Sequence, residues 1–100
     1  MNEYILLMHQ DALHTEAARN PQQWEQYLSQ LRSSGQFDGG SSMAPGLRLR
    51  KNQADQPGAN DLSGFIRVRA VSIESAKQFL AGNPVYEAGG TVEIRELPRN

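Results

Sequence analysis

Hydrophobic and polar positions alternate with a period of two in the second half of the chain. Residues 64–71 and 90–97 are each predicted to form a strand, because such alternation places successive side chains on opposite faces of a sheet. Between them, residues 72–80 carry apolar positions three and four apart, which is typical of a short amphipathic helix. Ser72 is a good N-cap for that helix, and Gly82 follows its end. The pattern therefore predicts a β-α-β unit.

The first half of the chain shows the same order of elements. Residues 2–9 contain a short apolar run bounded by polar residues and are predicted to form a buried strand. Asn20 can cap a helix that begins at Pro21, carries one apolar stripe and ends at Gly35. Residues 10–19 are polar and show no period, so we expect a loop there.

The middle of the chain is rich in residues that favour turns. Residues 36–46 hold several glycines and a proline and are predicted to be irregular. The alternating residues 47–50 predict the second strand, and residues 51–63 a long exposed loop. The simplest arrangement is one antiparallel sheet with two helices on one face. We therefore expect residues 1–100 to form a single domain of the α+β class, a ferredoxin-like βαββαβ sandwich.

Composition and charge exclude several classes of protein. The chain has 100 residues, no cysteine and a formal net charge of −1 at pH 7. Disulfides and thiolate metal sites are therefore excluded, and no basic excess points to nucleic acid. The apolar run at residues 4–8 is far too short to span a membrane. We expect a soluble, cytoplasmic protein with no cofactor, no metal and no nucleic-acid or membrane partner.

Alternation also predicts which side chains point away from the helices. Arg48 and Arg50 on the second strand would share this open face with Arg67 and Arg69 on the third, since these strands are neighbours in a ferredoxin-like order. Like charges that face each other across a strand pair repel. Three explanations stay open: charges screened by solvent, salt bridges in a dimer interface, or a cleft that binds an anion.

Two residues are candidates for acid–base chemistry. His9 ends the first strand, and histidine is the side chain that titrates nearest to neutral pH; Asp11 could orient its ring. The alternative is an ordinary polar residue at a strand end. Asp38 lies in a Phe-Asp-Gly-Gly turn and is either a catalytic carboxylate or a residue that bonds its own backbone. The spacing of His9, Asp11 and His14 does not favour a rigid metal site.

The chain as a whole resembles the YCII-related proteins, which include YciI-like and DGPF-type proteins. The resemblance rests on the order and spacing of these segments: Tyr4 to His9, the Pro21 helix with Trp24 and Tyr27, Gly35 with Gly39 and Gly40, the Gly64-Phe65 strand, the Ser72 helix, Asn83-Pro84, and Val92 to Pro98. It implies a ferredoxin-like fold that pairs into a dimeric α+β barrel, with the open sheet faces lining a cleft. A His–Asp pair in that cleft is the proposed enzymatic centre of the family. Gln23 stands at the position of the family's histidine and Asp38 at that of its aspartate, which leaves His9 as the local substitute.

Two functional hypotheses follow. The first is a homodimer that binds a small anionic molecule in a cleft on the open face, with His9 and Asp38 as catalytic residues and Arg48, Arg67 and Arg69 binding the substrate. The second is a non-enzymatic dimeric accessory or interaction module whose arginines serve assembly. The hypotheses differ in whether His9 and an arginine or aspartate converge on one concave site.

Overall fold

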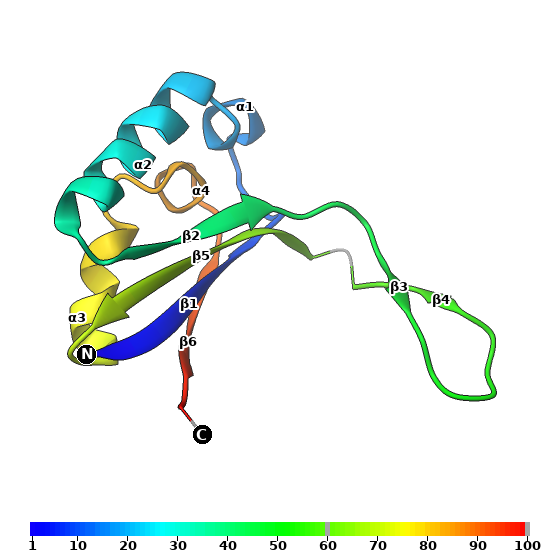
Figure 1. Cartoon of the computed structure of the whole chain (residues 1–100). Coiled ribbons are helices and arrows are strands. Elements are labelled where there is room, and N and C mark those ends of the chain that lie inside the picture. Colours follow the sequence, from blue (N-terminus) through cyan, green and yellow to red (C-terminus); the bar gives the residue numbers. More distant parts are fainter. Residues whose placement is uncertain (60, 100) are drawn as a thin grey trace.

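The computed structural model describes residues 1–59 and 61–99. Its main sheet has four antiparallel strands in the order β2-β5-β1-β6, and the helices lie on one face of it (Figure 1). The elements in chain order are β1 (Asn2–His9), α1 (Thr15–Ala18), α2 (Pro21–Ser34), β2 (Phe37–Ser42), β3 (Leu47–Arg48), β4 (Gln56–Pro57), β5 (Leu62–Ala70), α3 (Ile73–Ala76), the 3₁₀ helix η1 (Lys77–Leu80), α4 (Pro84–Glu87) and β6 (Val92–Leu97). This strand order is that of the ferredoxin-like α+β sandwich, and the predicted fold class is confirmed. Within the described ranges, no helix combines the length and apolar character needed to cross a bilayer.

Helix α2 begins and ends where its sequence predicts. The side chain of Asn20 accepts hydrogen bonds from two backbone N–H groups of the first turn, at 3.0 and 3.1 Å, and Pro21 occupies the first helical position. Gly35 ends the helix with a φ of 72°, a left-handed conformation that glycine adopts without steric cost. The helix buries Tyr27 and Leu31.

Strands β1 and β5 build the core by turning every second side chain toward the helices. These side chains are at most 4% exposed and are Tyr4, Leu6, Met8, Ile66, Val68 and Ala70. The alternation from which the sequence predicts a strand at residues 64–71 is confirmed. Ala76 of α3 and Phe79 of η1 complete the core from the helical layer. Full burial of a large aliphatic side chain contributes about 1.5–3 kcal/mol, so this layer is a major source of stability.

The second strand of the sheet is not the one that the sequence predicts. β2 pairs with β5, whereas β3 pairs only with β4 in a separate two-stranded sheet. Gly39 and Gly40, which indicate a turn by sequence, lie within strand β2. Gly39 has a φ of 100°, and the register shifts between Phe37 and Gly40, which is the behaviour of a β-bulge. Gly40 then lies directly against the backbone of β5.

Residues 43–59, which follow β2, form an arm that extends away from the sheet (Figure 1). Arg48 lies on this arm, where its Nε donates a hydrogen bond to the carbonyl of Pro57 at 2.8 Å. The prediction that Arg48 and Arg50 share the open face with the arginines of β5 is therefore wrong. Leu47 and Leu49 are also exposed, so the arm adds nothing to the core.

Two one-turn helices are not expected from the sequence. Helix α1 lies inside residues 10–19, for which the polar pattern predicts a loop. Asn83 starts α4 rather than a turn, because its side-chain oxygen accepts hydrogen bonds from two backbone N–H groups of that helix. The side chain of Asn83 is fully buried, and its amide nitrogen lies 3.5 Å from the sulfur of Met8. It therefore fastens α4 to β1.

We expect Gly40→Ala to lower the free energy of unfolding by about 1–3 kcal/mol. A Cβ at this position would overlap the carbonyl oxygen of Phe65 and lie 3.0 Å from the Cα of Ile66, both of which are backbone atoms. Gly46→Ala is the matched control, since a Cβ there would meet nothing within 4 Å. Urea denaturation measures both variants, and equal stabilities would contradict the close approach of β2 to β5.

Candidate functional site

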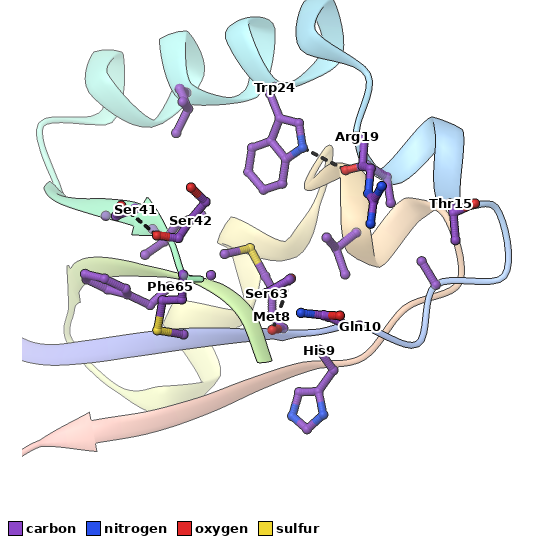
Figure 2. Close-up of a pocket in the computed structure, with 18 residues that line it drawn as sticks. Met8, His9, Gln10, Thr15, Arg19, Trp24, Ser41, Ser42, Ser63 and Phe65 are labelled. Atoms are coloured by element: carbon purple, nitrogen blue, oxygen red, sulfur yellow. Dashed lines mark hydrogen bonds between the residues drawn. The ribbon is translucent and has the colours of Figure 1, made fainter. Parts of the chain in front are cut away.

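A cavity of about 570 Å³ opens between helix α2 and the helix-facing side of the sheet (Figure 2). Its apolar lining comes from Met8, Ala12, Ala18, Trp24, Leu28, Ile66 and Val85, and Phe65, whose side chain belongs to the open face, borders it. Its polar lining comes from His9, Gln10, Thr15, Arg19, Ser41, Ser42 and Ser63. The volume and the mainly apolar wall with a few polar groups are those of small-molecule sites in general. The sequence predicted a cleft on the open face, whereas this cavity lies on the other side of the sheet.

The cavity exists because one corner of the sheet carries almost no side-chain volume on its helix side. Gly40 is paired with Ile66, and Ser42 with Gly64, so three of these four positions are glycine or serine. Two faces of the cavity are thus bare backbone of β2 and β5 rather than packed side chains. Trp24, which lies above this corner in Figure 2, cannot fill the space alone.

Trp24 forms a rigid wall on the α2 side. Its indole Nε1 donates a hydrogen bond to the carbonyl of Ala18 at 2.8 Å. Its ring packs edge-on against Tyr27, with centroids 5.9 Å apart. Burial raises the pKa of the Tyr27 hydroxyl, which therefore stays a neutral donor to the carbonyl of Phe79. Trp24 packs at the edge of the core and also lines the cavity.

Arg19 supplies the cavity with a charge that sequence reasoning missed. It follows helix α1 directly and lies with Thr15 at the α1 end of the cavity, opposite Ser41 and Ser42 (Figure 2). Arg19 is exposed, and in residues 1–59 and 61–99 no carboxylate forms an ion pair with it. No motif surrounds Arg19 in the sequence, and the packing of α1 against α4 is what brings it to the cavity.

His9 borders the cavity, but its ring points away from it (Figure 2). The reason is alternation: Met8 faces the helices, so the next side chain faces the open side of the sheet. There, His9 Nε2 lies 2.9 Å from a carboxylate oxygen of Glu93, whose other oxygen accepts a hydrogen bond from Arg95 at 2.7 Å. The hydrogen bond from His9, and to a smaller extent that from Arg95, lowers the pKa of Glu93.

Asp11 does not orient His9, contrary to our expectation. Its carboxylate accepts hydrogen bonds from the backbone N–H and the hydroxyl of Thr91, at 2.8 and 2.5 Å, and these hydrogen bonds lower the pKa of Asp11. Asp11 therefore connects the end of β1 to the start of β6. The carboxylate that contacts His9 is that of Glu93 and not, as expected, that of Asp11. Among the described residues, no three His, Cys, Asp or Glu side chains are grouped to hold a metal ion.

Asp38 lies at the opposite end of the open face from His9. Its carboxylate accepts hydrogen bonds from Arg69 Nε at 3.0 and 3.1 Å. Arg69 faces Glu3 across the sheet, and Glu3 is six positions from His9 along β1, which is about 20 Å at the rise of a strand. The structure does not bring Asp38 and His9 together. A catalytic role for either residue stays a prediction.

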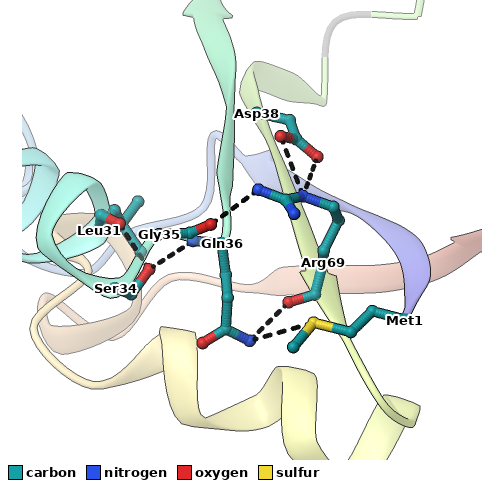
Figure 3. A network of polar contacts seen from close by, with 7 residues as sticks. All are labelled: Met1, Leu31, Ser34, Gly35, Gln36, Asp38 and Arg69. Atoms are coloured by element: carbon teal, nitrogen blue, oxygen red, sulfur yellow. Dashed lines mark hydrogen bonds and ion pairs between the residues drawn. The ribbon is translucent and has the colours of Figure 1, made fainter.

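Arg69 belongs to a network that joins the α2–β2 corner to β5 (Figure 3). Besides Asp38, its guanidinium donates to the carbonyl of Gly35 at 2.7 Å. The side-chain amide of Gln36 in turn donates to the backbone carbonyl of Arg69 at 2.8 Å. These contacts hold the α2–β2 corner against β5. The positive charge of Arg69 is offset by the carboxylate of Asp38.

The centre of the open face is apolar rather than crowded with arginines. Arg67 is exposed there and pairs in register with Ile5, while Leu7 pairs with Phe65. These three apolar side chains are only partly buried in the single chain. Arg48 and Arg50 lie on the arm and not on this face, and Arg69 is paired with Asp38. The expected cluster of four arginines is therefore not formed.

The fold has a counterpart among solved structures. This counterpart is 5-chloro-2-hydroxyhydroquinone dehydrochlorinase (TftG) from Burkholderia phenoliruptrix AC1100, in complex with 2,5-dihydroxybenzoquinone. The alignment has a TM-score of 0.56 and 13% sequence identity, and it covers 98% of this chain and 95% of TftG. The two chains share a fold. No protein-family model and no curated protein matches the chain, so its membership in the YCII-related family stays a prediction.

We expect Glu93→Gln to change how the free energy of unfolding depends on pH in the acidic range. The pKa of Glu93 lies below its ordinary value of 4.5, so near that pH the folded chain binds fewer protons at this site than the unfolded chain. The carboxylate therefore adds stability above that pH, and this stability is lost as the pH falls through the lowered pKa. The difference in unfolding free energy between wild type and Glu93→Gln should shrink on acidification.

Glu96→Gln is the control, because Glu96 is exposed on the same strand and makes no ion pair in the described part of the chain. Denaturant titrations between about pH 6 and pH 3 measure both variants across the range in which carboxylates protonate. A stability difference for Glu93→Gln that stays constant over this range would contradict the pairing with His9 and Arg95.

Proposed function

We propose that the protein binds a small molecule in the cavity beneath Trp24. The observation that carries this proposal is the pre-formed space of about 570 Å³, walled by an indole ring that two contacts hold in place. Protein interiors are packed with few voids larger than a water molecule. An opening of this size into the core therefore favours a binding role over a packing role.

The molecule bound to TftG supports the size of the proposed ligand. TftG has the same fold and was solved with 2,5-dihydroxybenzoquinone, a planar ring with polar substituents. The cavity of the present chain offers an apolar wall at Trp24 and a hydroxyl group at Ser42 to such a molecule. A small, planar and partly polar compound is thus the class that we propose.

A thermal-shift screen tests this proposal. At ten times its dissociation constant, a ligand that binds only the folded state should raise the melting temperature by about 6–10 °C. The panel contains 2,5-dihydroxybenzoquinone, small aromatic carboxylates and their amides. Ser42→Phe, which adds a ring at the cavity wall, should abolish the shift, whereas Ser33→Phe on the exposed side of α2 should keep it. Absence of any shift in the wild-type protein, or an equal shift in both variants, would contradict binding in this cavity.

We also propose that two copies pair through their open sheet faces. Ile5, Leu7 and Phe65 form the partly exposed apolar centre of that face, and charged side chains such as Arg67, Arg95 and Glu93 surround it. An apolar centre with a polar rim is the usual composition of a protein–protein interface. The resemblance to the YCII-related proteins, whose open faces pair, also supports a homodimer.

Leu7→Lys should convert this dimer to a monomer, because it places a charge at the apolar centre of the pairing face. Ile73→Lys is the matched control, since Ile73 is 44% exposed on α3, on the helical side of the sheet. Sedimentation velocity measures the mass of each species. A wild-type chain that stays monomeric at the highest attainable concentration would contradict pairing, as would dissociation of both variants.

An acid–base enzyme is the second candidate, and the His9–Glu93 pair favours it. A carboxylate that accepts a hydrogen bond from one ring nitrogen of a histidine fixes the ring and leaves the other nitrogen available. Arg67 on the same face would bind a negative group of a substrate. Compounds from the thermal-shift panel can be analysed by mass spectrometry after incubation with the protein. If all are recovered unchanged, the alternative of a non-enzymatic dimeric accessory module is favoured.

A further inference from the structure

Resting on the proposed ligand cavity, we propose that its ligand is an anion with a planar apolar body, and that Arg19 binds the anionic group. The chemical class is that of an aromatic carboxylate or a molecule of similar charge and shape. Arg19 would then determine which small molecules the cavity accepts. The open-face arginines, from which the sequence suggested an anionic ligand, play no part in this site.

The charge of the cavity comes from one side chain. Arg19 is the permanently charged residue among those that line it, and no aspartate or glutamate of residues 1–59 and 61–99 lines it. An arginine stays protonated at any pH a protein encounters. The ring of His9 is turned to the open face, where Glu93 is its partner. The cavity therefore presents a positive charge that no lining group neutralises, and such a charge next to an apolar wall attracts anions.

The apolar wall determines the shape of the ligand. Trp24 is held by its hydrogen bond to Ala18 and by Tyr27, so its ring cannot turn aside to admit a bulky group. A planar ring can lie against the indole with an offset or edge-on contact. Arg19 lies at one end of the cavity, and Ser41 and Ser42 lie at the other (Figure 2). A ligand with its anionic group at Arg19 would extend its apolar body toward β2.

The alternative anion sites are weaker in this structure. Arg69 is bound by Asp38, and Arg95 by Glu93. Arg48 lies on the arm and donates to a backbone carbonyl. Arg67 is exposed on the open face and does not line the cavity beneath Trp24. Arg19 therefore combines a charge without an ion-pair partner and an adjoining apolar space.

The test compares acids with their neutral amides. The probes are 3-phenylpropanoate and 3-phenylpropanamide, with acetate as an anion that lacks the apolar body. Trp24 is the single tryptophan of the chain, so its fluorescence, excited where the probes do not absorb, reports binding at the cavity wall itself. We expect the acid to bind about tenfold more tightly than the amide, which is the contribution of one charge-assisted hydrogen bond. Acetate should bind weakly or not at all.

Arg19→Gln should remove the preference for the acid by weakening acid binding about tenfold while leaving amide binding unchanged. Arg32→Gln makes the same change of charge at an exposed residue of α2 outside the cavity, and it should behave like the wild type. Equal binding of acid and amide by the wild type, or an unchanged preference in Arg19→Gln, would overturn the role of Arg19 while leaving ligand binding intact. Failure of both the acid and the amide to perturb Trp24 would overturn the proposed cavity function and this inference with it.

Discussion

The alternation of side chains along β1 is the constraint on which the rest of the structure depends. Met8 and His9 are neighbours in the chain, yet one faces the helices and the cavity and the other faces the open side of the sheet. Leu6 and Val68, both fully buried, fix this phase, because a slip of one residue would turn the whole apolar set into solvent. The sheet therefore separates the cavity side from the open face, and neighbouring residues of β1 contribute to opposite sides.

The second constraint is the close approach of β2 to β5. The bulge at Gly39 and the absence of a side chain at Gly40 allow the edge strand to lie against the backbone of β5. The same lack of side chains leaves the sheet bare beneath Trp24. One short glycine-containing strand thus completes the sheet and leaves room for the cavity, so a residue that fills this corner should affect both stability and the proposed binding.

Sequence patterns predicted the elements whose signals are local. The cap at Asn20, the stop at Gly35 and the alternation of β5 are encoded in a few neighbouring residues, and the structure has them as expected. The strand β2 was missed because glycines in a bulge have the same composition as glycines in a turn, and that error moved Arg48 to the wrong sheet. The site was missed for a different reason: Arg19 reaches the cavity, and Glu93 reaches His9, only through contacts between segments far apart in the chain, which no local pattern records.

A shared fold with TftG leaves the chemistry of this chain to be argued from its own residues, because one fold supports many functions. On the cavity side, the polar lining offers hydroxyls, an amide and the guanidinium of Arg19, none of which is an ordinary general base at neutral pH. The histidine that could act as one lies across the backbone of β1, paired with Glu93. The proposed ligand site therefore lies on the cavity side of the sheet, and the His9–Glu93 pair lies on the open face. The two could act on one molecule only if that molecule moved between faces, so binding alone is the simpler proposal for the cavity.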